Sequence, residues 1–150
     1  MINWQDPKSK ITTNFTVKDG IYLPTWSRLA NESDGLNDTI KENLINVCAK
    51  MEAIRILLGN RPIHVHCMYR PEMYNKIIGG STKSQHMIGN ACDFSLVGGS
   101  TNKDCDMVRE TLKPELENLN IRMEDVSDKS NRAWVHIDLK VPSPNRYFKP

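Results

Sequence analysis

Two histidines and one aspartate attract attention in this sequence because together they can bind a metal ion. His86 and Asp93 enclose six residues that include Gly89, at which the backbone can turn easily. A third candidate, His136, lies in the fragment Trp134-Val135-His136-Ile137-Asp138. Two imidazole nitrogens and one carboxylate oxygen are a common ligand set for a catalytic zinc, which keeps a fourth position open for water. We therefore expect the rest of the chain to bring these fragments together around one Zn²⁺ per chain.

Two predicted strands place a candidate catalytic base beside this site. Residues 121–126 and 133–140 alternate in hydrophobicity and are joined by a polar loop, as in an antiparallel pair. If paired residue numbers sum to about 260, the apolar faces of both strands coincide, and a slip of one residue would separate them. Glu124 then lies opposite His136. Directly opposed side chains are about 5 Å apart at Cβ, so Glu124 can reach a water on a metal held by His136.

This arrangement predicts a hydrolytic mechanism. Zinc lowers the pKa of its water towards about 7 and polarises the scissile carbonyl, while Glu124 takes the proton and later returns it to the leaving amine. Arg70 can offer a two-pronged contact to a substrate carboxylate, and Ser84 is placed to hydrogen-bond substrate near the metal. In the same register Arg122 lies opposite Asp138, which we therefore interpret as a structural ion pair rather than a catalytic one.

Length and composition are those of one globular domain covering residues 1–150. The formal net charge of +2 is too small to indicate nucleic-acid binding, and no basic run with interleaved aromatics is present. No run of about 18 apolar residues predicts membrane insertion. The first ten residues do not resemble a signal peptide, so we expect synthesis in the cytoplasm and another route out. Cys48, Cys67, Cys92 and Cys105 form no C-x-x-C pair and predict reduced thiols.

Helices and strands alternate in the expected secondary structure. An apolar stripe from Ile40 to Leu58 indicates a long helix, with Thr39 and Glu42 as a capping box and a stop at Gly59-Asn60. In the strand predicted at 91–96, alternation turns Asp93 to a cleft and its neighbours to the core. The other predicted elements are a strand at 63–67, helices at 71–79, 102–112 and 114–119, short turns or one short helix within 11–30, and an irregular tail from 141.

Three ordered motifs resemble those of the M15 zinc peptidases, of the D-alanyl-D-alanine carboxypeptidase and L-alanyl-D-glutamate endopeptidase type. Residues 84–93 match the pattern S-x-H-x-x-G-x-A-x-D, and Trp134-Val135-His136 matches the later W-x-H element. Met68-Tyr69-Arg70-Pro71, Asn75 and Gly79-Gly80-Ser81 are similar to the Y-R-x…N…G-G-S stretch that precedes the first motif. The resemblance covers roughly residues 44–138.

The resemblance implies a small α+β fold in which an antiparallel sheet, flanked by helices, carries one zinc ion. It also implies a zinc-dependent peptidase that cleaves peptide bonds in the stem peptides of bacterial peptidoglycan. His86, Asp93 and His136 would be the zinc ligands, and Arg70 and Ser84 would contact the substrate. Phage lysis enzymes of this kind also lack a signal peptide, so the resemblance favours a phage-type cell-wall lytic enzyme.

The chain departs from the family pattern at the catalytic base. Several members carry an acid three residues before the last histidine, and here that position is Ala133. Other branches place a glutamate on the preceding strand, and Glu124 resembles that arrangement. Asp128 is a second candidate, since a loop could bring it to the site.

Two other interpretations stay open. A non-catalytic relative could keep the zinc for structure or binding, as the related Hedgehog signalling domain does, and Ala133 is in keeping with this. A metal-free structural protein is the third possibility, which requires that the three motifs persist without their chemistry. The sequence alone leaves the cleaved bond, the oligomeric state and a phage or bacterial origin open.

Overall fold

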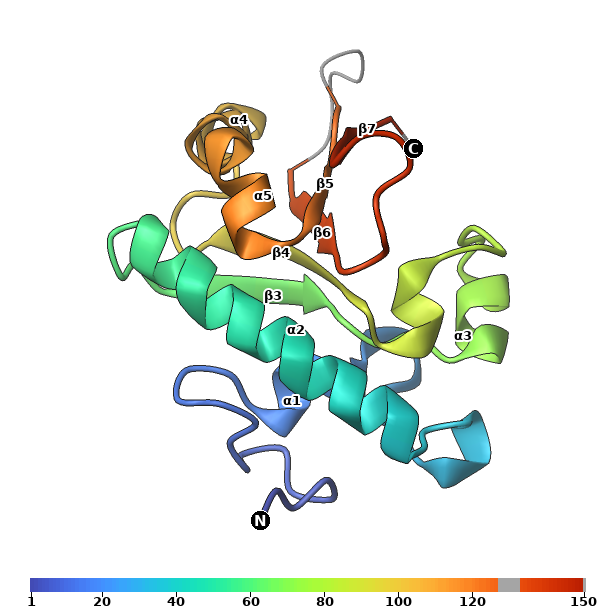
Figure 1. Cartoon of the computed structure of the whole chain (residues 1–150). Coiled ribbons are helices and arrows are strands. Elements are labelled where there is room, and N and C mark those ends of the chain that lie inside the picture. Colours follow the sequence, from blue (N-terminus) through green and yellow to red (C-terminus); the bar gives the residue numbers. More distant parts are fainter. Residues whose placement is uncertain (127–132, 150) are drawn as a thin grey trace.

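The computed structural model describes residues 1–126 and 133–149, in which a five-stranded sheet has the strand order β3-β4-β6-β5-β7 (Figure 1). Neighbouring strands are antiparallel, except that β5 and β7 are parallel. The strands of this sheet are β3 (Ile63–Cys67), β4 (Ala91–Leu96), β5 (Arg122–Glu124), β6 (Val135–Asp138) and β7 (Tyr147–Phe148). A separate pair joins β1 (Tyr22–Leu23) to β2 (Arg28–Leu29).

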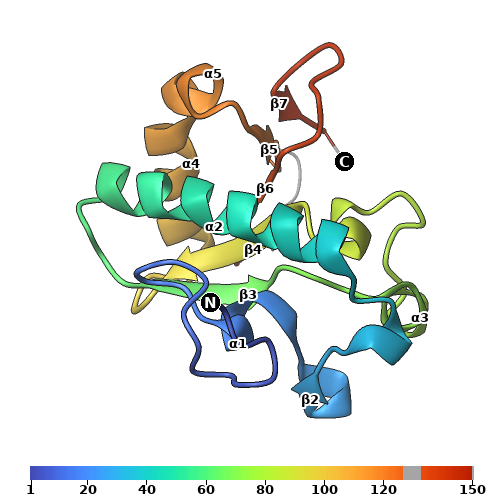
Figure 2. The same ribbon diagram turned by 60° about the horizontal axis from the view of Figure 1, so that its bottom comes forward.

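Helices flank the sheet, and the longest of them crosses it. The helices are α1 (Val17–Ile21), α2 (Asp38–Leu57), α3 (Glu72–Ile77), α4 (Asn102–Leu112) and α5 (Leu116–Leu119). Both views show α2 running along β3 and β4, with α4 and α5 near its C-terminal end and α3 near its N-terminal end (Figures 1 and 2). The predicted α+β fold with an antiparallel sheet flanked by helices is confirmed. No helix in the described ranges has the length and apolar character that a membrane span requires.

Helix α2 buries the apolar stripe that the sequence predicts. Its buried side chains include Leu44, Met51 and Ile54, which belong to the shared core. The predicted capping box at Thr39 is wrong, because the helix begins two residues earlier. The Asn37 side chain accepts a hydrogen bond from the Ile40 backbone N–H at 2.9 Å and so caps the first turn.

The strand register agrees with the sequence pattern. Strands β5 and β6 pair Arg122 with Asp138 and Met123 with Ile137, as the predicted antiparallel register requires. Apolar residues of β4 and β6, among them Cys92 and Ile137, belong to the core beneath the helices. The opposite face of these strands carries Asp93 and His136, so one side of the sheet supplies the core and the other the site. All four cysteines are free, as predicted.

The two ends of the chain differ from the expectation. Residues 141–149 were predicted to be irregular, but β7 forms there and pairs Met123 with Tyr147 and Glu124 with Phe148. A strand of only two residues, after a proline-rich stretch, is too short to show a periodic pattern. It depends on contacts with β5 that the local sequence does not encode. The N-terminal region contains α1 together with β1 and β2, where the sequence indicated only turns or one helix.

Candidate metal centre

A short 3₁₀ turn before β4 presents His86. This turn, Gln85–Ile88, is capped by Ser84, whose side-chain oxygen accepts a hydrogen bond from the His86 backbone N–H at 3.2 Å. It ends at Gly89, which has a φ of +68°. A Cβ atom at Gly89 would lie 3.1 Å from the backbone oxygen of Ile40 on α2, so glycine satisfies both the left-handed turn and the close packing. The chain then enters β4, on which Asp93 follows.

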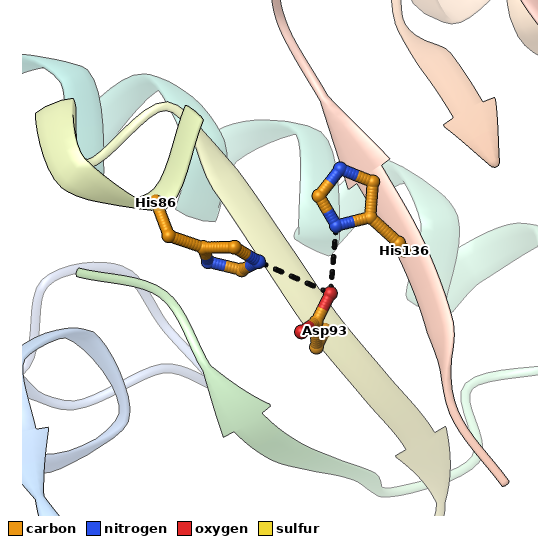
Figure 3. A group of neighbouring side chains, drawn as sticks. All are labelled: His86, Asp93 and His136. Atoms are coloured by element: carbon orange, nitrogen blue, oxygen red, sulfur yellow. Dashed lines mark hydrogen bonds and ion pairs between the residues drawn. The ribbon is translucent and has the colours of Figure 1, made fainter. Parts of the chain in front are cut away.

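Strand pairing brings the third candidate ligand to the first two. His136 on β6 lies directly opposite Asp93 on β4. The Asp93 Oδ1 atom is 2.7 Å from His136 Nδ1 and 3.2 Å from His86 Nε2 (Figure 3). One donor atom from each of the three residues lies within 4.8 Å of the others. Within residues 1–126 and 133–149 this is the one group of three or more histidines, cysteines or acids with that property.

Hydrogen bonds on the far sides of the rings orient both imidazoles. His86 Nδ1 lies 2.7 Å from the carbonyl oxygen of Met68, which can only accept, so Nδ1 carries the hydrogen and Nε2 faces Asp93. His136 Nε2 lies 3.1 Å from Asp138 Oδ2, so its Nδ1 faces Asp93. His86 Nε2 is buried and makes no hydrogen bond in the described structure. His86 Nε2, His136 Nδ1 and the Asp93 carboxylate are therefore better suited to bind a shared metal cation than to hydrogen-bond to one another.

The electrostatics of the cluster also call for a positive charge between the three groups. Burial lowers the pKa of His86, but the Asp93 carboxylate outweighs it and raises the pKa to about 10. Burial raises the pKa of Asp93, but His86 and His136 outweigh it and hold the pKa far below its usual range. The pKa of His136 is raised against its burial by Asp138 and Asp93. A divalent cation between the three groups can supply this positive charge.

A cleft of about 390 Å³ opens over the cluster. The predicted base, Glu124, lines this cleft and is 7% exposed. Glu124 comes directly after Met123, which pairs with Ile137 of β6. Continuing this antiparallel register by one residue leads to His136. The second candidate base, Asp128, lies outside the described residues.

Both predicted substrate contacts line the same cleft. Arg70 Nη2 donates to Ser84 Oγ at 3.1 Å, and the Arg70 backbone N–H donates to the His86 carbonyl at 2.9 Å. The buried Nε of Arg70 has no hydrogen-bond partner among the described residues. Lys83 on the neighbouring loop also lines the cleft. This wall of the cleft is therefore rich in donors and positive charge.

Asn75 and Gly80 hold the loop that leads to Ser84. The buried Asn75 side chain donates to the Ser81 carbonyl at 2.9 Å, and the backbone carbonyl of Asn75 accepts from the Gly80 backbone N–H at 2.8 Å. A Cβ atom at Gly80 would lie only 2.0 Å from Asn75 Oδ1. These contacts explain in physical terms why an asparagine precedes a pair of glycines here.

The sequence did not reveal two features of the site. Asp138 pairs with Arg122, as predicted, but its contact with His136 was missed, although their spacing of two on one strand places them on the same face. Phe148 on β7 lines the cleft, and nothing in the local sequence indicated this. The histidines of β3, His64 and His66, lie outside the cleft lining.

Comparisons with known proteins agree with this arrangement. The sequence pattern of the family described as Peptidase M15 matches residues 25–138. The chain is also similar to a zinc D-Ala-D-Ala carboxypeptidase of Streptomyces albus G, with 34% identity over 56 residues. That match covers 37% of this chain and 22% of the relative, so the chain matches well under two thirds of the relative's length.

Proposed function

The chain belongs to the Peptidase M15 family, and on this premise we propose that it is a zinc peptidase that cleaves stem peptides of bacterial peptidoglycan. One observation carries the proposal: His86, Asp93 and His136 direct three donor atoms at one point, and both imidazoles are held from behind in the orientation that a metal needs. This donor set is one that zinc prefers in catalytic sites. Family membership and the cluster agree with the zinc cofactor predicted from the sequence.

Glu124 is proposed as the proton carrier of the reaction. A zinc ion held by His86, Asp93 and His136 would polarise the scissile carbonyl and acidify a water. The buried Glu124 carboxylate, on the strand next to His136, would accept a proton from this water and return it to the leaving amine. Its burial at the cleft limits competition from bulk water for the same proton.

The charge of the cleft wall favours a peptide that carries a carboxylate near the scissile bond. Arg70 is fixed by its contact with Ser84 and still has an unused buried N–H group. A guanidinium binds a carboxylate through two parallel hydrogen bonds. Lys83 adds a second cation on the same side. Peptidoglycan stems offer such carboxylates at their D-alanine end and at their glutamate.

Digestion of purified peptidoglycan, with mass analysis of the products, tests this function. Release of free D-alanine would indicate carboxypeptidase activity, whereas release of longer peptides would indicate an endopeptidase. Lysis of intact cell walls would support the finer proposal of a phage-type lytic enzyme. A zinc-loaded protein that releases no product from any wall preparation would contradict the proposal.

The Glu124→Gln variant tests the assignment of the base. We expect it to keep about one zinc per chain and to lose roughly 10²- to 10⁴-fold in turnover, the usual contribution of a general base. Glu117→Gln, at an exposed position of α5, is the matched control and should retain full activity. Full activity in Glu124→Gln would move the role to another acid, with Asp128 the next to test.

The second candidate function is a non-catalytic zinc-binding relative of the same fold. Ala133 supports it, because an acid stands at this position in several members of the family. The two functions are separated by the zinc-loaded parent protein, which cleaves wall peptides only if the first is correct.

A further inference from the structure

A second carboxylate lies behind His136. The ring is held between two acids, with Nδ1 2.7 Å from Asp93 Oδ1 and Nε2 3.1 Å from Asp138 Oδ2. Asp138 is 1% exposed. Because its oxygens meet the far side of the ring, Asp138 acts on His136 from outside the group of three proposed ligands.

Asp138 is itself held by several donors. Arg122 Nε donates to Asp138 Oδ1 at 2.7 Å, and Arg122 Nη2 donates to Oδ2 at 2.8 Å. The Lys140 backbone N–H donates to Oδ1 at 3.1 Å. A carboxylate with this many fixed donors is held in one orientation, and its two contacts with the Arg122 guanidinium are charge-assisted hydrogen bonds.

The C-terminal strand holds the arginine. The guanidinium carbon of Arg122 lies 3.8 Å from the centre of the Phe148 ring, within the range of a cation–π contact. The same ring lies 6.1 Å from the His136 ring, nearly perpendicular to it. Pairing of β7 with β5 sets Phe148 beside Glu124 and thus beside the cleft.

We propose that Asp138 is a positioning residue for the metal centre and that Arg122 and Phe148 hold it in place. Asp138 accepts the Nε2–H hydrogen of His136, which leaves Nδ1 unprotonated and aimed at the metal. Arg122 fixes the carboxylate, and Phe148 covers Arg122. The C-terminal strand is therefore part of the support of the metal site. This inference rests on the proposed role of His136 as a ligand.

The alternative is that Arg122 and Asp138 merely join two strands. A structural ion pair would change stability but would leave the zinc affinity of the folded protein unchanged. A carboxylate behind a ligating histidine fixes its tautomer and raises its basicity, and loss of such a partner lowers metal affinity by about 10- to 100-fold. Zinc affinity measured on folded protein therefore separates the two roles.

The chain contains a matched control for this test. Arg28 and Asp34 also form a two-pronged pair, at 2.7 and 2.9 Å, and Arg28 also lies against an aromatic ring, that of Trp26. Neither member of this pair lines the cleft. Asp34→Asn removes the same chemistry as Asp138→Asn, but at a place that contacts none of the proposed ligands.

The experiment is a competition between the protein and a coloured chelator for zinc, together with the absorption spectrum of the cobalt-substituted protein. Asp138→Asn should bind zinc about 10- to 100-fold more weakly and change the cobalt spectrum, because an asparagine can donate to Nε2 and so favour the wrong tautomer. Asp138→Glu should recover part of the affinity. Arg122→Lys and Phe148→Ala should show the same change to a smaller degree, and Asp34→Asn should show none.

Unchanged zinc affinity and an unchanged cobalt spectrum in folded Asp138→Asn would overturn the inference. If that variant fails to fold, Phe148→Ala decides, because unchanged affinity and spectrum in this milder variant would equally contradict it. The readout needs no peptidase activity. A parent protein that binds zinc but cleaves nothing would therefore refute the proposed function without touching this inference, whereas a parent that binds no zinc would refute both.

Discussion

Two pairs of histidines lie against each other among the described residues, and one of them, His86 and His136, belongs to the group that could hold a metal ion. His86 and His136 have ring centres 5.1 Å apart at an interplanar angle of 69°. His64 and His66 on β3 have ring centres 4.6 Å apart at 82°. The two rings of the outer pair, His64 and His66, are thus closer to each other than the two rings of the inner pair, His86 and His136. Proximity of two imidazoles alone does not distinguish a metal site.

The carboxylate between the rings makes the first difference. Asp93 contacts both members of the inner pair, whereas His66 contacts the hydroxyl of Ser95 at 2.9 Å. The pKa values respond in opposite directions. The pKa of His86 is raised to about 10 by Asp93 despite burial, while that of His66 is lowered by partial burial and by His64. Only the inner pair therefore attracts a cation strongly.

The groups behind the rings make the second difference. The inner pair faces a backbone carbonyl and the Asp138 carboxylate, both of which can only accept hydrogen bonds and so fix the tautomers. The Ser95 hydroxyl can donate or accept and fixes none. The groups that surround a histidine therefore decide its role more than the nearest ring does.

The largest expected effect follows from loss of an inner histidine. His86→Ala removes one of the three proposed ligands and one of the two histidine partners of Asp93, so the purified protein should fall from about one zinc per chain to nearly none. His64→Ala, which removes a ring from the outer pair, should leave the zinc content unchanged. Elemental mass spectrometry of both purified variants checks this. Equal zinc loss in both would remove the distinction between the pairs.

Removal of the metal should have the next largest effect. A ligand present at about 1,000 times its Kd stabilises the folded state by ~4 kcal/mol, which for a chain of this size is roughly 8 to 16 °C in Tm. A strong chelator should lower the Tm of the parent and of His64→Ala by this amount. It should leave His86→Ala unaffected, since that variant has no zinc to lose. Calorimetry with and without chelator provides the measurement.

The smallest expected effect concerns the outer pair itself. Because His64 lowers the pKa of His66, His64→Ala should raise the pKa of His66. Partial burial is the larger cause and persists, so this pKa should stay below its ordinary value of about 6.5. Titration of the His66 ring protons by NMR follows the change. A downward shift would contradict the electrostatic account of this pair.

Much of the inner site was predictable because its strands are patterned on both faces. The apolar face of β6 fixes the register that sets Met123 against Ile137, and this register carries Arg122 and Asp138 into contact on the other face. Gly89 likewise marks the turn between the first two ligands. At these positions the residue type that the local pattern calls for is also the one that the tertiary structure needs, so the sequence alone indicates the strand register and the turn.

The parts that were missed depend on contacts between distant segments. Phe148 lines the cleft because the two residues of β7 pair with β5 at the edge of the sheet. So short a strand has no periodic pattern by which the sequence could predict it. The cap of α2 was placed at Thr39, although Asn37 is an equally suitable residue and the backbone decides between them. The double role of Asp138 needed the direction of the His136 ring, which only the folded structure provides.

The position of β7 late in the chain sets the order in which the site forms during synthesis. His86 and Asp93 leave the ribosome first, and the chain must grow by about 55 residues beyond Asp93 before Phe148 is added. At 5–20 residues per second this takes roughly 3 to 11 s. For most of that interval, until His136 is added 43 residues after Asp93, the nascent chain carries only two of the three proposed ligands. Binding of the metal by all three proposed ligands must therefore follow the synthesis of β6, and the support that Phe148 gives to Arg122 is added last.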